Sequence, residues 1–315
     1  MDETEEKLQK IFVPTHYSEW QKLRDPKAKL VYYTSADTAL RILKNEEVWM
    51  RSTKTMNDYQ EVTHGFHGLD DALTNAPGIA LKAELEKLHP GMFDGVIEQT
   101  KRSLNRWLYG SYITCLSRHD SVENKYGRLS MWRAYGAPNS VAMVLNNGPF
   151  ISSDDTLGAF SAAVDYMDVD EYGTHIQSLT KRIAAEGDFI KATDPEELSG
   201  RLRYTFAAAM LCTKHPAFRE EREWRVFHTP GEDPTGKLTM SVESIGGVPQ
   251  RVVKIPLKEF PGTPLDLSIP TLLDRIIIGP CLMPVTMLDA FLTVLTEKGV
   301  ADPQSKIHIS GVPLR

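Results

Sequence analysis

Short runs of apolar, β-branched and aromatic residues recur along the chain, separated by polar or proline-containing segments. Runs of this length and composition predict β-strands, because such side chains suit a pleated and at least half-buried surface. The predicted strands occupy residues 30–34, 48–52, 112–117, 141–145, the end of 218–227, 252–256, 275–280 and 307–310.

Helical periodicity fills most of the intervals between these strands. Ser35 suits the N-cap of a helix in which Ala36, Ala39, Leu40 and Leu43 share one face. Further helical patterns cover residues 79–109 with a break at 89–91, a segment around 131–135, residues 171–214 with a break near 194–195, and residues 285–297.

The order of these elements predicts one domain with a short extension. Residues 1–29 are polar, contain Pro14 and Pro26, and predict a loose helical N-terminal arm. Residues 30–315 carry no repeat or long linker, which favours a single α+β domain with a mainly helical insertion around residues 171–214.

Composition narrows the class of protein. The chain has 315 residues, 41% of them hydrophobic, and a net charge of −6, which argues against a globally basic nucleic-acid binder. Cys115, Cys212 and Cys281 show no paired-thiol or zinc spacing, so we expect reduced thiols. The acidic N-terminus and the lack of an apolar run of about 18 residues predict a soluble cytoplasmic protein without a membrane span.

Residues 218–227 place three acids and three bases directly before an apolar run. Charged side chains are rarely buried unless they are paired, so this alternation predicts a lattice of ion pairs. In an extended chain Glu221 and Glu223 would share one face, and Arg222 would point to the other. The two carboxylates could serve chemistry, or they could pair with Arg219 and Arg225 for stability.

Other candidate residues lie where strands end. Tyr32, Tyr33 and Thr34 precede the first helix, where polar side chains can meet a ligand or pack into the core and surface. Ser117 closes a strand, and Trp132 could stack on a base or fill the core.

Two further groups carry weaker signals. Asn57, Asp58 and Glu61 lie in or after a polar loop, where an Asx turn is an equal interpretation. His64 and His67 have helical spacing, but no third ligand is evident and no metal site is predicted. The sequence contains no phosphate-binding glycine motif and no nucleophile elbow.

Several of these segments together resemble a bacterial and phage family of unknown function, DUF2971. The motifs that carry the resemblance are Tyr32-Tyr33-Thr34, Ile42-Leu43, Trp49 to Ser52 with Asn57, Asp58 and Glu61, Cys115 to Ser117, Met131-Trp132 with Tyr135-Gly136, Glu221 with Glu223 to Arg225, and Ile277 to Gly279.

The layout of that family is similar to the ADP-ribosyltransferase superfamily, in which a split β-sheet holds NAD between its strands. The resemblance implies that Tyr33 or Tyr32 takes the first site position, Ser117 or Ser52 the second, and Glu223 the third, with Glu221 as the leading acid. Ser117 would then steady Glu223, and Thr34, Asn57 and Trp132 would contribute to binding NAD. We expect Trp224 and Arg225 to be structural, with Trp224 buried and Arg225 paired with an acid rather than in contact with the cofactor.

The leading hypothesis from the sequence is therefore an NAD-dependent, ADP-ribosyltransferase-like enzyme acting in conflict between phage and bacteria. Its acceptor would be an unknown protein, a nucleic acid or water, and water would make it an NAD glycohydrolase. One alternative is a noncatalytic binding module, such as a defence sensor or phage accessory protein. A third is a magnesium-dependent nuclease that uses Asp58, Glu61 and Glu223.

Overall fold

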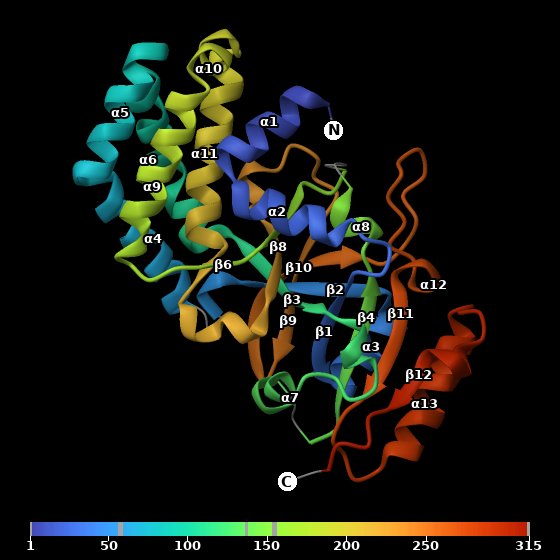
Figure 1. Ribbon diagram of the computed structural model, residues 1–315. Helices are drawn as coiled ribbons and strands as arrows, with labels where there is room; N and C mark the ends of the chain where they lie inside the picture. The colour runs from blue at the N-terminus through green and yellow to red at the C-terminus, as the bar shows by residue number, and fades with distance from the viewer. Residues whose placement is uncertain (1, 56–58, 136–137, 153–155, 314–315) are drawn as a thin grey trace.

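A computed structural model describes residues 2–55, 59–135, 138–152 and 156–313. Figure 1 shows a group of helices at one end of the molecule and a twisted sheet at the other, with the two termini at opposite ends. The helices are α1 Glu3–Phe12, α2 Pro14–Leu23, α3 Ala36–Asn45, α4 Tyr59–Thr74, α5 Ala76–Leu88, α6 Met92–Gly110, α7 Leu129–Tyr135, α8 Gly148–Ile151, α9 Glu171–Ala185, α10 Gly187–Ala192, α11 Pro195–Leu211, α12 Ile269–Leu272 and α13 Pro284–Glu297.

The strands form an open, mixed and largely antiparallel sheet. They are β1 Lys29–Ser35, β2 Glu47–Ser52, β3 Tyr112–His119, β4 Ser140–Asn146, β5 Ala159–Ala163, β8 Glu223–His228, β9 Thr239–Ile245, β10 Val248–Pro256, β11 Leu273–Ile278 and β12 Ile307–Ile309. Their main order is β12-β11-β4-β1-β3-β2-β10-β9, while β8 pairs with both β3 and β5. A separate parallel pair joins β6 Asp165–Tyr166 to β7 Thr213–Lys214. The prediction of an α+β fold class is confirmed.

Strand β3 pairs with three neighbouring strands, and two of them diverge along one of its edges, which leaves a gap in the sheet. On one edge its C-terminal residues pair with β1, as in Val31 opposite Ser117, and its N-terminal residues pair with β2, as in Arg51 opposite Ile113. Residues 114–116 lie between these two registers, so β1 and β2 diverge beside them. The other edge of β3 pairs continuously with β8.

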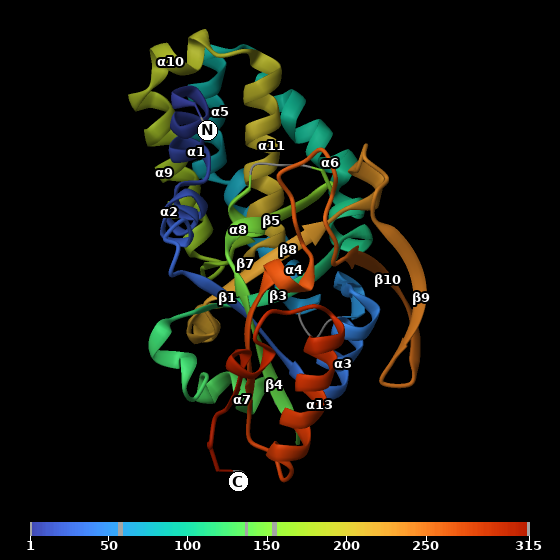
Figure 2. The same cartoon turned by 90° about the vertical axis from the view of Figure 1, so that its right-hand side faces the viewer.

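Residues directly opposite each other in a sheet share a face, so these registers define two faces. One face carries Tyr33, Ser117 and Glu223, and it is covered by α7 and by the helical layer of α4, α5, α6, α9 and α11. The opposite face carries Tyr32 and Trp224 and packs in the same core as α3 and α13. Figure 2 shows α3 and α13 side by side next to β4.

Local signals in the sequence account for much of this arrangement. The hydroxyl of Ser35 accepts a hydrogen bond from the backbone N–H of Thr38, which caps α3 as expected. The predicted helical insertion folds as α9, α10 and α11, and it packs against α4, α5 and α6 from the earlier helical segment. The helical layer is therefore assembled from two separate parts of the chain.

The N-terminal segment differs from the loose arm that its polarity predicts. Helices α1 and α2 are well defined, and Leu8, Ile11, Phe12 and Leu23 are buried. Three of these four side chains join the core of the helical layer, so the segment is packed rather than loose. No helix in the described ranges has the length and apolar character needed to cross a bilayer.

Candidate functional site

Glu223 lies at the start of β8 and is 5% exposed. Its carboxylate accepts a hydrogen bond from Nε of Arg225 at 2.6 Å and another from Nζ of Lys214 at 3.1 Å. The same Lys214 ammonium also donates to the Glu221 carboxylate at 2.8 Å. Two acids and two bases thus form a compact cluster whose formal charges cancel. We call these four residues the ion-pair cluster.

The ion-pair cluster fixes the protonation state of Glu223. Burial alone raises the pKa of this carboxyl group, but Arg225 and Lys214 outweigh burial and lower the pKa to about 2. Glu223 is therefore ionised at neutral pH. The prediction that Arg225 pairs with an acid is confirmed, and so is the prediction that Trp224, at 1% exposed, is buried.

The backbone before Glu223 does not follow the extended path expected from the sequence. Residues Pro216–Glu221 form the 3-10 helix η3, and Arg222 adopts a left-handed conformation with φ of 49°. The expectation of an extended Glu221–Glu223 segment is therefore wrong. The carboxylates of Glu221 and Glu223 converge because both contact Lys214, which the sequence pattern did not single out.

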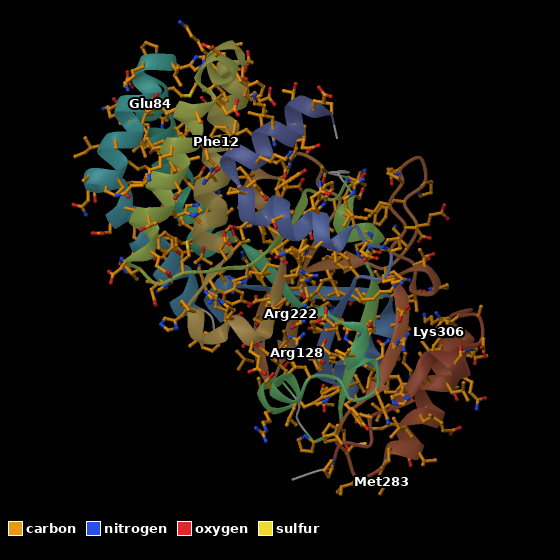
Figure 3. All side chains as sticks on the ribbon, in the orientation of Figure 1. Phe12, Glu84, Arg128, Arg222, Met283 and Lys306 are labelled. Atoms are coloured by element: carbon orange, nitrogen blue, oxygen red, sulfur yellow. The ribbon has the colours of Figure 1, made fainter. Side chains whose placement is uncertain are left out.

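Arg128 clamps this turn onto the end of β3. Its guanidinium donates to the carbonyl oxygens of Glu220 and Glu221 at 3.1 Å each, to that of Arg118 at 2.7 Å, and to the Glu123 carboxylate at 2.7 Å. In Figure 3, Arg128 and Arg222 lie near each other above α7. Because Arg128 is 9% exposed, these bonds are shielded from water and hold the turn rigidly.

A cavity of about 180 Å³ opens beside the ion-pair cluster, on the face of the sheet that carries Glu223. We call it the acidic cleft. It is lined by Val31, Tyr32 and Tyr33 of β1, Trp49 and Arg51 of β2, Ile113 to Ser117 of β3, Met131 and Tyr135 of α7, and Glu221 and Glu223. Residues that are far apart in the sequence therefore meet where β1 and β2 diverge.

A second cavity of about 570 Å³ adjoins the acidic cleft. We call it the polar cleft. It is lined by Tyr32, Thr34, Asp37, Thr38, Arg41, Ile42, Asn45, Glu47, Trp49, Arg51, and residues 244–247 at the tip of the β9–β10 hairpin. Tyr32, Trp49 and Arg51 line both cavities, so the two clefts meet at these three side chains.

The two tyrosines of β1 have different environments. The Tyr33 hydroxyl accepts a hydrogen bond from the backbone N–H of Arg128 at 2.8 Å, and the ring packs edge-on against Trp132 with centroids 4.8 Å apart. Burial raises the pKa of Tyr33 to about 12. Tyr33 is thus anchored in the core, whereas Tyr32 is half-buried and lines both clefts. Position favours Tyr32 as the ligand contact.

The remaining predicted site residues divide into two groups. Ser117 lines the acidic cleft, but its hydroxyl donates to the backbone carbonyl of Glu221 at 2.6 Å, so it holds the turn rather than the Glu223 carboxylate. Thr34 lines the polar cleft. Ser52 and Trp132 line neither cleft. Trp132 is buried and donates to the carbonyl of Tyr126, which matches the core interpretation rather than NAD contact.

Asn57 and Asp58 lie outside the described residues, as does the side chain of Glu61. Within the described part of the chain, no group of three or more His, Cys, Asp or Glu side chains could hold a metal ion. His64 instead contacts the carbonyl oxygen of Met167 through Nε2 at 2.9 Å.

Comparison with known proteins was informative for one segment. Residues 131–226 match the family model described as a protein of unknown function (DUF2971). The match supports the resemblance to this family that the motifs indicate. It runs from α7 into β8 and includes Glu221 and Glu223, whereas β1 and Ser117 precede it. No curated protein and no solved structure matches the chain, so the likeness to ADP-ribosyltransferases stays a prediction.

No site role was predicted for Lys214 of the ion-pair cluster, or for Trp49 and Arg51, which line both clefts. Trp49 and Arg51 alternate with Val48 and Met50 along β2, and this alternation places them on the face opposite the buried Met50. That pattern was visible in the sequence. The position of Lys214 depends on the pairing of β6 with β7, which no local pattern specifies.

Proposed function

We propose that the joined clefts bind an NAD-type dinucleotide and that the ion-pair cluster lies at the end where its glycosidic bond is broken. The observation that carries this proposal is the meeting of the polar cleft and the acidic cleft at Tyr32, Trp49 and Arg51. The proposed reaction is ADP-ribosyl transfer to a hydroxyl group or to water.

The size and chemistry of the clefts support binding of such a ligand. Small-molecule sites usually have volumes of about 300–1,000 Å³, and the polar cleft falls in this range at about 570 Å³. Arg51 donates from Nη2 to the carbonyl oxygen of Thr55 at 2.8 Å and from Nε to Gln250 at 3.3 Å. Its positive charge and its remaining N–H groups suit a diphosphate. Tyr32 and Trp49 supply aromatic rings that can pack against a base or a nicotinamide ring.

The chemistry of the acidic cleft follows from its two carboxylates. In the proposed reaction, the bond between C1′ of the ribose and the nicotinamide nitrogen breaks, and nicotinamide leaves with the electron pair. The acceptor oxygen then bonds to C1′, and its proton passes to Glu221. Ionised Glu223 would stabilise the positive charge that develops on the ribose, because a fixed opposite charge lowers that barrier.

A second candidate is a module that binds the dinucleotide without turning it over. The ion-pair cluster favours this candidate, because Lys214 and Arg225 offset the negative charge that Glu223 would direct at the ribose. A carboxylate held between two cations stabilises a nearby positive charge less than an unpaired one does.

Nicotinamide release from NAD tests the proposal. Wild-type protein is assayed with water, protein and nucleic-acid acceptors and compared with Glu223→Gln, which keeps the shape of the side chain and removes its charge. We expect turnover by the wild type and a loss of at least about a hundredfold in rate, or roughly 3 kcal/mol of barrier, in Glu223→Gln.

Glu221→Gln serves as a second variant if Glu223→Gln unfolds, and circular dichroism establishes that the folds match. It should slow transfer by removing the proton acceptor. Binding of NAD with no nicotinamide released for any acceptor would contradict the transferase and support the noncatalytic module. Equal rates in the wild type and a folded Glu223→Gln variant would remove Glu223 from the mechanism.

A further inference from the structure

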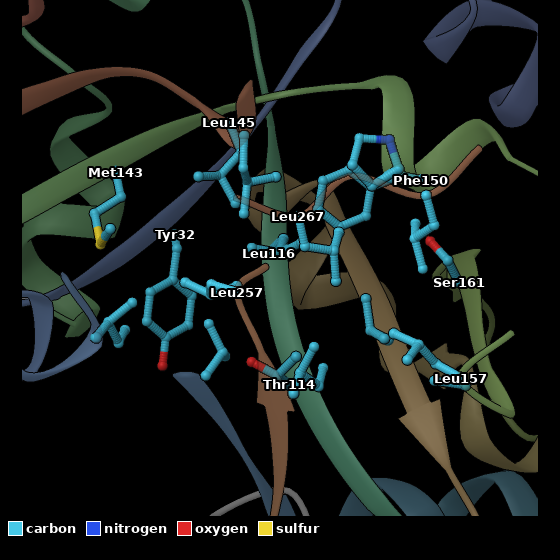
Figure 4. Close-up of a pocket in the computed structure, with 18 residues that line it drawn as sticks. Tyr32, Thr114, Leu116, Met143, Leu145, Phe150, Leu157, Ser161, Leu257 and Leu267 are labelled. Atoms are coloured by element: carbon cyan, nitrogen blue, oxygen red, sulfur yellow. The ribbon is translucent and has the colours of Figure 1, made fainter. Parts of the chain in front are cut away.

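A third cavity, of about 120 Å³, lies on the opposite face of the sheet from the ion-pair cluster. We call it the apolar pocket. Figure 4 shows Tyr32 and Met143 on one side of it and Phe150, Leu157 and Ser161 on the other. The pocket lies within the core that joins both halves of the divided sheet, because its lining comes from β1, β2, β3, β4, β5, β8 and β10.

The lining of the apolar pocket is almost entirely aliphatic or aromatic. The polar side chains that line it are Tyr32, Thr114 and Ser161. The Ser161 hydroxyl accepts the indole N–H of Trp224, so that oxygen is already engaged in the core. Tyr32 and Thr114 form the polar end of the pocket, where their side chains hydrogen-bond to each other, and both also line the acidic cleft.

A void of this kind is unusual in a well-packed core. Protein interiors pack about as densely as organic crystals and contain few spaces larger than a water molecule. A water molecule needs two to four polar partners to occupy a cavity stably, whereas apolar cavities of roughly 150 Å³ stay dry and bind benzene or xenon. The apolar pocket, at about 120 Å³, therefore suits an apolar group better than water.

We infer that the apolar pocket is a ligand site for a small aromatic or branched alkyl group whose polar end contacts Tyr32 and Thr114. The site lies behind the gap between β1 and β2, so a ligand there has its polar end toward the acidic cleft. Occupancy of this site involves no bond-breaking step and does not require NAD.

Binding of benzene and phenol to the full-length protein tests the inference, with titration followed by NMR or by thermal shift in the absence of NAD. We expect saturable binding of both compounds to the wild type. Ala159→Leu extends a side chain into the pocket and should weaken both affinities at least tenfold. Ala83→Leu makes the same change on the exposed surface of α5 and should leave both affinities unchanged.

The polar end is tested by Thr114→Val, which replaces a hydroxyl with a methyl group of similar shape. We expect phenol to bind several-fold more weakly and benzene to bind as before. If Thr114→Val changes neither affinity or both equally, the assignment of the polar end is wrong.

Xenon pressurisation of wild-type crystals avoids any question of variant folding. A xenon site among Leu116, Leu145 and Leu267 is the expected result. The inference is overturned if xenon does not occupy this position, if neither compound binds the wild type, or if a folded Ala159→Leu variant binds both as tightly as the wild type.

Discussion

At the residue scale, the basic residues that pair with a buried carboxylate determine its charge and its position. The Glu and Arg residues of 218–227 predicted an ion-pair lattice, and Glu223 with Arg225 is one such pair. The partner that brings Glu221 and Glu223 together is Lys214, which arrives from β7. Lys214 could not be predicted, because a contact between separate strands leaves no periodic signal in the sequence.

The low pKa of Glu223 predicts a stability that depends on pH. The pKa falls from an ordinary value of 4.5 to about 2 on folding, so the stabilisation is present above pH 4.5 and is lost as pH falls toward 2. This shift corresponds to about 3 kcal/mol at neutral pH. Urea unfolding should show wild-type protein more stable than Glu223→Gln by about that amount at pH 6, with the difference vanishing near pH 2.

Glu297→Gln provides the matched control, since it makes the same chemical change at an exposed position on α13. Its unfolding free energy should follow the wild-type curve at every pH. A difference between wild type and Glu223→Gln that stays constant from pH 6 to pH 2 would show that Glu223 does not titrate as the ion-pair cluster requires.

At the element scale, most strands and helices were predictable, but α4, β5, β9 and the turn before β8 were not. The strands at β1, β3 and β4 lie where β-branched and aromatic runs predicted them, and the break at residues 89–91 separates α5 from α6. The prediction for the turn before β8 was wrong, because the pattern of acids and bases suited an extended strand. Contacts from Arg128 to two backbone carbonyls of η3 stabilise the turn instead, and such contacts are invisible to periodicity.

The Arg128 clamp predicts a local change in backbone protection. Arg128→Lys replaces a planar, forked donor with a single ammonium group that cannot reach the same set of carbonyls. We expect amide hydrogen exchange of residues 216–222 to become at least tenfold faster, while α9 and α11 keep their protection.

Arg133→Lys is the control, because Arg133 is exposed on α7 beside the clamp. It should leave exchange in residues 216–222 unchanged. Unaltered exchange in Arg128→Lys, or an equal increase throughout the molecule, would show that Arg128 does not hold this turn specifically.

At the scale of the whole molecule, the sequence predicted the α+β fold class and several residues that line the acidic cleft. It did not predict the order of the strands in the sheet. Strand β3 pairs with β1, β2 and β8, which come from both earlier and later parts of the chain. Pairing between distant segments depends on the complete fold rather than on local propensity. The gap between β1 and β2, and with it the position of Arg51, therefore became visible only in the structure.

The proposal that the joined clefts bind an NAD-type dinucleotide rests on this arrangement of strands. Tyr32, Tyr33, Ser117 and Glu223 line one cavity, as expected of a site built on a divided sheet. Arg51 lies where that cavity meets the polar cleft, and under the proposed function its guanidinium would contact the diphosphate of the dinucleotide. Binding, rather than turnover, depends most directly on this geometry.

Isothermal titration of NAD into the wild type, Arg51→Met and Arg251→Met is the most direct test. Arg251 is exposed on β10, so Arg251→Met is a matched loss of one arginine outside the clefts. We predict that the wild type and Arg251→Met bind NAD with equal affinity and that Arg51→Met binds at least tenfold more weakly, since charge-assisted bonds to phosphate contribute about 1.5–3 kcal/mol. Failure of the wild type to bind NAD, or unchanged affinity in a folded Arg51→Met variant, would contradict the account.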